Sequence, residues 1–267
     1  MLFYTICSGF VSATTVFSDE PDKILHEKCL YPTVMVALRG EGRTYSRGTG
    51  VIIRSEKADD AYFNVVVTCH HVLANTDMAI KLPIFKNLST FEKWEIFPAI
   101  NFAGNKDNDL GIVLFVSSKP MPTANWGMDE KLFMGTKVMK IACGNGEDPR
   151  LDWGYINSLN NAKHEYSGKI RTSIVTILGD SGGPVFCDYK IIGLVQSIKM
   201  MGGTPVTCIS NVIPASLFKK WNEEEKDRLS FIYNPEKKLP TLSFAIAKFE
   251  SYEINNNAIP KHHWETK

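Results

Sequence analysis

The stretch "GDSGGPVF", Gly179 to Phe186, decides how the rest of the chain is interpreted. A serine between glycines is common in tight turns, but its hydroxyl becomes a nucleophile when a base removes its proton. Ser181 would then need a histidine and an orienting carboxylate, brought to it from other parts of the chain. A structural turn and an activated nucleophile are therefore the two interpretations to separate.

The bulk composition describes a globular protein. The chain has 267 residues, of which 44% are hydrophobic and 22% are charged, which is enough for a substantial core. Lys and Arg number 30 against 29 Asp and Glu, so the net charge is +1 and no nucleic-acid partner is expected. No apolar run is long enough to span a membrane, so we expect no integral membrane segment.

The cysteines do not indicate a metal centre. They form no CxxC pair and no His/Cys spacing typical of zinc, so we expect no metal and no cofactor. We interpret them as mostly buried thiols: Cys7, Cys29, Cys69, Cys143, Cys187 and Cys208.

The first residues, "MLFYTICSGFVSATTVFS", are apolar and contain the small-residue sequence V-S-A. This end is typical of a signal peptide, whereas the absence of Lys or Arg before Lys23 is not. Residues 1–18 therefore fit either a signal peptide or an N-terminal extension. Removal of residues 1–13 would favour a secreted or periplasmic protein, and their retention a cytoplasmic one.

β-strand patterns dominate the middle of the chain. The segments are short, rich in Val and Ile, and bounded by Gly, Asn, Asp or Pro, as is typical of closely spaced antiparallel strands. A short helix is expected in "SDEPDKILHEKC", where Ser18 or Asp19 could cap it and Pro21 falls in its first turn. Helical spacing of apolar residues is found in "PASLFKKWNEEEKDRLSFI" near the end. The clearest strands begin at Thr33, Gly50, Phe63, Met78, Gly111, Lys137, Gly154, Lys169, Lys190 and Thr204.

Two adjacent histidines are the candidate bases. His70 and His71 follow the apolar strand in "VVVTCHHVL", and a buried strand can hold an imidazole rigidly. The candidate carboxylate is Asp109 in "DNDLGIVLF", at the mouth of a strand where its charge can be buried against an imidazole. Asp107 is the weaker candidate. The backbone N–H groups of Gly179 and Ser181 could stabilise an oxyanion, because a tight turn can aim both at one point.

These motifs, in this order, resemble the trypsin-like (chymotrypsin-fold) serine proteases, and among them the HtrA/Deg protease domain. "GTGVII" at Gly48–Ile53 resembles the family's GSGxII strand, "TCHHV" its T-x-x-H-V motif, "NDLGIVLF" its D-L-A-V-L motif, and "GDSGGPVF" its G-N-S-G-G-P motif. Because the motif's Thr stands three residues before the catalytic His, Thr68 points to His71. The resemblance covers roughly Tyr31–Lys220 and implies an all-β fold of two six-stranded antiparallel β-barrels, with a C-terminal helix.

The resemblance also implies a serine endopeptidase that acts on protein or peptide substrates. His71 would be the base, Asp109 its orienting carboxylate and Ser181 the nucleophile, with the amides of Gly179 and Ser181 as the oxyanion hole. The protease domain would occupy residues 19–232 and a C-terminal tail residues 233–267, with no PDZ domain. The alternative is a catalytically idle trypsin-fold binding module, which would normally lack a triad residue or an intact glycine turn. The oligomeric state leaves no trace in the sequence.

One residue departs from the HtrA pattern. Asp180 stands where HtrA proteins usually carry Asn. In trypsins the equivalent carboxylate pairs with a newly freed N-terminus, but the IVGG-type start that trypsin zymogens expose is absent here. The partner of Asp180 is therefore an open question.

The resemblance places the specificity pocket between "VTILG" and "VQSIK". Val175 stands six residues before Ser181, where trypsin has a carboxylate for Lys or Arg, so trypsin specificity is not expected. An apolar wall, to which Val212 could contribute, would favour a small or medium aliphatic side chain before the cut. The candidate substrate-binding residues are Val175, Thr176, Ile177, Gln196 and Ile198.

Overall fold

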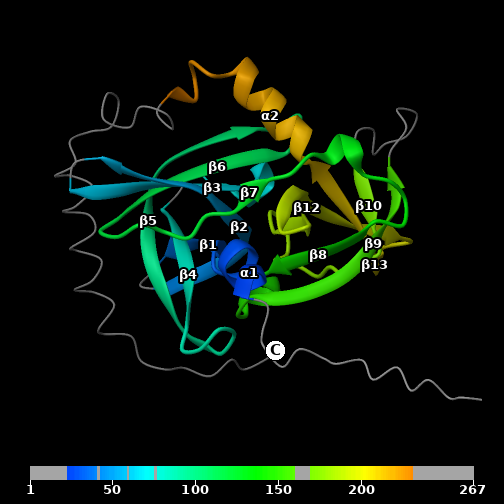
Figure 1. Cartoon of the computed structure of the whole chain (residues 1–267), viewed down its shortest axis with the longest axis horizontal. Coiled ribbons are helices and arrows are strands. Elements are labelled where there is room, and N and C mark those ends of the chain that lie inside the picture. The colour runs from blue at the N-terminus through cyan, green and yellow to red at the C-terminus, as the bar shows by residue number, and fades with distance from the viewer. Residues whose placement is uncertain (1–22, 41–42, 59, 75–76, 160–168, 231–267) are drawn as a thin grey trace, which may run out of the picture.

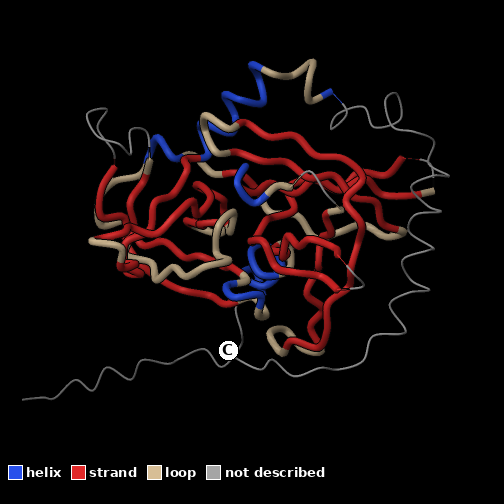
Figure 2. Tube along the Cα trace, turned by 180° about the vertical axis from the view of Figure 1, so that it is seen from behind, coloured by secondary structure: helices blue, strands red, loops and turns tan. Residues whose placement is uncertain are grey.

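The computed structural model describes residues 23–40, 43–58, 60–74, 77–159 and 169–230. Strands make up most of it, and they form two barrels side by side (Figures 1 and 2). The expected signal peptide or extension and the expected tail lie outside the described residues. Within the described ranges, none of the helices has both the length and the apolar character needed to cross a membrane.

The first barrel is closed and antiparallel throughout. Its strand order is β1-β2-β3-β6-β5-β4, and the pairing of β1 with β4 closes it. Every residue of β6 is buried, which explains why "GIVLF" is a continuous apolar run. The strands are β1 (Thr33–Gly40), β2 (Arg43–Ala58), β3 (Ala61–Cys69), β4 (Met78–Phe85), β5 (Phe91–Asn105) and β6 (Leu110–Ser117).

The sequence patterns do not predict β5, although it is among the longest strands. Its sequence contains Pro98, which cannot donate a ladder hydrogen bond and normally argues against a strand interior. Here Pro98 pairs with Ala79 of β4, and the register with β6 shifts between Ala99 and Asn101. A local irregularity next to the proline thus lets the strand continue.

The second barrel is closed by the pairing of β11 with β12. Its order is β11-β8-β9-β10-β13-β12, and the short β7 (Asn125–Trp126) adds to β12 in parallel. The predicted class, two six-stranded antiparallel barrels, is thereby confirmed. The strands are β8 (Lys137–Ala142), β9 (Arg150–Leu159), β10 (Ile170–Thr172), β11 (Pro184–Cys187), β12 (Lys190–Met201) and β13 (Thr204–Pro214).

The predicted C-terminal helix is α2 (Ala215–Glu224), which lies across the top of the molecule where the barrels meet (Figure 1). Its Phe218 stacks on Trp126 with ring centroids 4.8 Å apart, and Trp221 is also buried. The helical turns elsewhere are short: α1 (Lys23–Leu25), η1 (His26–Leu30), η2 (His70–Val72), η3 (Asp129–Lys131) and η4 (Gly144–Gly146).

The two barrels share one apolar cluster at their junction. Cys69 and Val72 of the first barrel belong to the same buried cluster as Met139, Ile141 and Leu194 of the second. Because protein interiors pack as densely as organic crystals, this cluster fixes the position of one barrel against the other. Residues from both barrels can therefore build one rigid site at the junction.

Candidate active site

His71 lies in the 3₁₀ helix η2, directly after the buried strand β3. Its backbone N–H donates to Asp109 Oδ1 at 3.0 Å. The guanidinium of Arg47 also donates to the carbonyls of His71, at 3.0 Å, and Leu73, at 3.3 Å. Two sets of hydrogen bonds therefore hold the turn, and no sequence pattern pointed to the contribution of Arg47.

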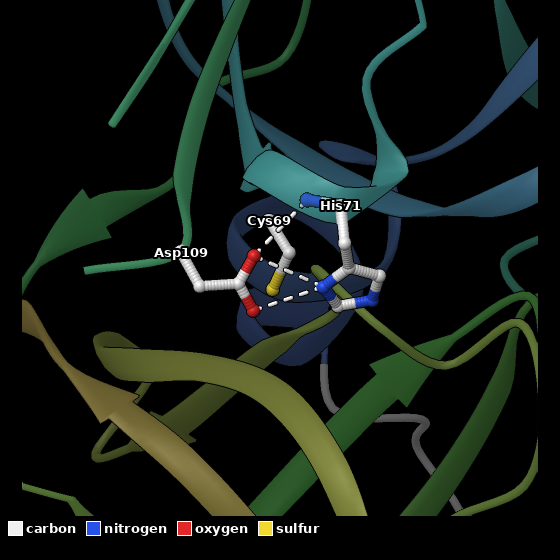
Figure 3. A group of neighbouring side chains, drawn as sticks. All are labelled: Cys69, His71 and Asp109. Carbon is white, nitrogen blue, oxygen red and sulfur yellow. Dashed lines mark hydrogen bonds and ion pairs between the residues drawn. The ribbon is translucent and has the colours of Figure 1, made fainter. Parts of the chain in front are cut away.

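Asp109 ends the turn that precedes β6 and faces the His71 ring (Figure 3). Its carboxylate oxygens lie 3.0 and 2.9 Å from His71 Nδ1. Its backbone φ is 54°, a strained value for a residue with a side chain, and its carbonyl accepts the N–H of His70 at 3.0 Å. Burial opposes ionisation, but hydrogen bonds from His71 and the Gln196 side chain lower the pKa of Asp109. The carboxylate is thus held ionised against the imidazole.

The alternative candidates lie elsewhere. His70 packs against β5, where a Cβ added to Gly104 would lie 2.2 Å from His70 Nδ1. Asp107 is exposed in the turn before β6. The structure thus brings together His71 and Asp109, the pair that the motif resemblance selected.

Ser181 lies in the turn before β11, and this turn packs against the first barrel. The carbonyl of Ser181 accepts the N–H of Thr49 at 2.8 Å. Gly182 has φ of +83°, and a Cβ there would lie 2.1 Å from Thr68 Oγ1 and 2.2 Å from the Thr49 carbonyl. Only glycine fits this approach, which explains why a glycine follows the serine.

Gln196 of β12 connects the serine to the carboxylate. Ser181 Oγ donates to the backbone carbonyl of Gln196 at 3.2 Å, and a hydrogen bond from the Gln196 side chain contributes to lowering the pKa of Asp109. Among the described residues, no hydrogen bond joins Ser181 Oγ to His71, and such bonds are often loose before substrate binds. The substrate-binding role expected for Gln196 stays a prediction.

The two amides expected at the oxyanion hole are those of Gly179 and Ser181. No acceptor within the described ranges receives the N–H of Gly179 or Ser181. Asn145 N–H donates to the Leu178 carbonyl at 2.8 Å, and Thr49 Oγ1 donates to the Gly179 carbonyl at 2.8 Å. Because N–H and C=O point in opposite directions across a trans peptide, the bond from Asn145 directs the N–H of Gly179 away from η4. Sequence patterns gave no signal for Asn145 or for the role of Thr49.

The open question about Asp180 has a structural answer. Its side chain is fully buried and forms an ion pair with the fully buried Lys140 and with Arg150, the latter at 3.1 Å. The N–H of Ile177 also donates to Asp180 Oδ2, at 2.9 Å. The one available signal was the lysine in the apolar strand "KVMKIA", whose residues after Lys137 are all buried.

The expected substrate-binding residues differ in accessibility. Val175 is 46% exposed, whereas Ile177 and Ile198 are half-buried. Thr176 is buried and hydrogen-bonds to the Ser210 hydroxyl. Val212 is fully buried in the core of the second barrel, so it does not form part of an accessible wall.

Cys69 completes a group of three ligand-bearing side chains (Figure 3). A ligand atom from each of Cys69, His71 and Asp109 lies within 4.8 Å of the others, so the group could offer three ligands to a metal ion. Burial and the charge of Asp109 raise the pKa of Cys69. The neutral, buried thiol donates to the Val195 carbonyl at 3.2 Å. Cys69 thus links the two barrels, which is a structural role.

The double barrel with this junction defines a trypsin-like fold. Residues 48–194 match the family model described as "Trypsin-like peptidase domain". This match covers more than half of the chain, so the protein belongs to the trypsin-like peptidase family.

Two relatives agree with this assignment. The "Putative protease Do-like 14" of Arabidopsis thaliana is 24% identical over 181 residues, which are 63% of this chain and 40% of that protein. The chain therefore spans well under half of that relative. The solved structure "HtrA-type protease AlgW with decapeptide" is similar in fold, with a TM-score of 0.61 and 16% identity over 77% of this chain and 67% of that chain. The expected resemblance to HtrA-type proteases is thereby confirmed for the fold.

Proposed function

We propose that the protein is a serine endopeptidase that works through Ser181, His71 and Asp109. The observation that carries the proposal is the His71–Asp109 pair, hydrogen-bonded at 2.9 Å beside the turn that holds Ser181. Membership of the trypsin-like peptidase family supports the same reaction. The decapeptide named with the HtrA-type structure supports a peptide as the substrate.

In the proposed mechanism each residue has one step. Because His71 Nδ1 faces an ionised Asp109, Nδ1 carries the proton and Nε2 is free to accept one. Ser181 Oγ would give up its hydrogen bond to the backbone carbonyl of Gln196 and donate to His71 Nε2 instead. It would then transfer its proton to His71 Nε2 and attack the scissile carbonyl. Water then hydrolyses the acyl-enzyme, with His71 again as the base.

The amides of Gly179 and Ser181, which have no acceptor among the described residues, would stabilise the oxyanion of each tetrahedral intermediate. Removal of a single oxyanion donor costs about 10²–10³-fold in turnover in other enzymes of this type. The positions of both amides depend on the contacts of Thr49 and Asn145, which come from β2 and η4. The proposed site therefore uses the rigidity of both barrels.

The proposed preference is for a small or medium aliphatic residue before the cut. Val175 is partly exposed and Ile177 and Ile198 half-buried, so apolar surface is available to a substrate. No carboxylate stands at position 175 to attract Lys or Arg. Discrimination should be modest, because one methylene in an apolar pocket is worth about 1–3 kcal/mol.

The test is hydrolysis of a peptide library, with the products identified by mass spectrometry. Wild-type protein should cut after Ala, Val or Leu, and Ser181→Ala should cut nothing while keeping the wild-type circular dichroism spectrum. Ser173→Ala, outside the proposed machinery, is the control and should cut normally. A folded wild-type protein that cuts no peptide, or a Ser181→Ala variant that still cuts, would refute the endopeptidase assignment.

A further inference from the structure

We propose that Lys140 is a positioning residue: its buried ammonium group holds Asp180, and with it the turn that presents the amides of Gly179 and Ser181. This inference rests on the proposed function, because it concerns how that site is kept assembled. The cation is part of a strand of the folded chain. Assembly of the oxyanion turn therefore needs no newly formed N-terminus.

The position of Lys140 suits this role. It lies in β8, which pairs with β11 directly after the Ser181 turn, and its side chain is 0% exposed. Its Nζ contacts the Asp180 carboxylate, the Val175 carbonyl and, at 3.1 Å, Asp152. An ammonium group has three N–H donors, and these contacts provide three acceptors.

Asp180 transmits this anchoring to the turn. It lies between the two residues whose amides would bind the oxyanion, and its carboxylate also accepts the N–H of Ile177 at 2.9 Å. Its own N–H donates to the Ile177 carbonyl at 3.2 Å, and its carbonyl accepts the N–H of Gly183 at 2.9 Å. Fixing the carboxylate thus fixes the peptide planes on either side of Asp180.

Burial makes Lys140, rather than Arg150, the principal charged partner of Asp180. Asp180 and Lys140 are both 0% exposed, whereas the Arg150 side chain is 34% exposed, so water screens its charge. Removal of Lys140 would leave the buried Asp180 carboxylate with only the partly exposed Arg150 as a charged partner, and breaking a buried ion pair in this way is strongly destabilising. Without Lys140, the Asp180 carboxylate would be driven towards water and would displace Gly179 and Ser181.

The acidic side chain at position 180 itself requires the cation. An Asn at this position could accept the N–H of Ile177 without needing a cation. This chain has an Asp and, within the described residues, a fully buried Lys beside it. The buried cation and the acidic residue therefore form one functional pair.

The test compares Lys140→Met with Lys137→Met, since Lys137 is exposed on the same strand. The first readout is the rate at which a fluorophosphonate probe labels Ser181, because the reaction needs the oxyanion amides. Lys140→Met should label about 100-fold more slowly, the loss expected for one oxyanion donor, and Lys137→Met should label normally. Arg150→Met should show a smaller loss than Lys140→Met.

The second readout is hydrogen exchange of the peptide that covers residues 177–183. Lys140→Met should raise exchange there, and Lys137→Met should not. Hydrogen exchange can be measured whether or not the protein is active. A folded wild-type protein that the probe does not label would refute the proposed function, and the exchange data would still decide the role of Lys140. Unchanged exchange over 177–183 in folded Lys140→Met, or unchanged labelling in an active protein, would overturn the inference.

A third variant separates positioning from simple stabilisation. Asp180→Asn removes the charge that Lys140 compensates, so adding it to Lys140→Met should restore labelling to the rate of Asp180→Asn alone. The same comparison holds if Lys140→Met by itself does not fold, because the double variant buries no unpaired carboxylate at position 180. Two results would contradict the proposed pair. In one, the double variant matches Lys140→Met in both the labelling rate and the exchange over residues 177–183. In the other, the double variant labels far more slowly than Asp180→Asn alone.

Discussion

The Gly182→Ala substitution should damage both the fold and the site, because no side chain fits where the Ser181 turn meets the first barrel. Gly182 has φ of +83°, and an added Cβ would lie 2.1 Å from Thr68 Oγ1 and 2.2 Å from the carbonyl of Thr49. The backbone conformation alone costs a residue with a Cβ about 1–2 kcal/mol. Relief of the clash, which involves backbone, costs about 1–3 kcal/mol more, so the loss should total about 2–5 kcal/mol.

A matched control separates these two contributions. Gly135 has φ of +88° with nothing within 4 Å of an added Cβ, so Gly135→Ala carries the backbone cost alone. Urea unfolding of both variants measures the difference, and labelling of Ser181 by a fluorophosphonate probe should be slowed by Gly182→Ala alone. Equal unfolding free energies for the two variants would refute the close approach between the turn and β2 and β3.

Three further predictions concern the residues around the triad. Asp109→Asn should lower kcat about 10⁴-fold, whereas Asp107→Asn should leave it unchanged; the reverse result would exchange their roles. Thr49→Val should lower kcat more than it raises KM, because the hydroxyl that donates to the Gly179 carbonyl is lost; an unchanged kcat would contradict this. Because the pKa of Asp109 is lowered on folding, its stabilising contribution is complete above the usual aspartate range and is lost as the pH falls through the lowered pKa. Acid unfolding of Asp109→Asn should lack this contribution, and an identical pH dependence would contradict it.

The fold was predictable because its strongest elements carry local signals. Strands such as β3 and β6 are buried almost throughout, so their sequences are continuous apolar runs. The order of the histidine, aspartate and serine motifs then indicated the double barrel. The same motifs pointed to the contact of His71 with Asp109. His71 lies in the turn that follows β3, and Asp109 directly precedes β6.

Other features depend on contacts between distant segments, which no local pattern reveals. Thr49 and Gly179 lie far apart in the sequence, and only the closed barrels bring them together. Lys140 stands out in the sequence as a lysine within an apolar strand, but only the pairing of β8 with β11 shows that it lies next to the strand that follows the Ser181 turn. The strand β5 was missed because most of its residues are half-buried, so its sequence shows neither a continuous apolar run nor a regular alternation.

The most direct test of the account is a fluorophosphonate reaction with the wild-type protein, followed by peptide mapping of the adduct by mass spectrometry. A phosphonyl group on Ser181, absent from Ser181→Ala and strongly reduced in His71→Ala, is the result the account predicts. An adduct on another residue, or no adduct on a protein whose fold is intact, would contradict the claim that Ser181 is an activated nucleophile.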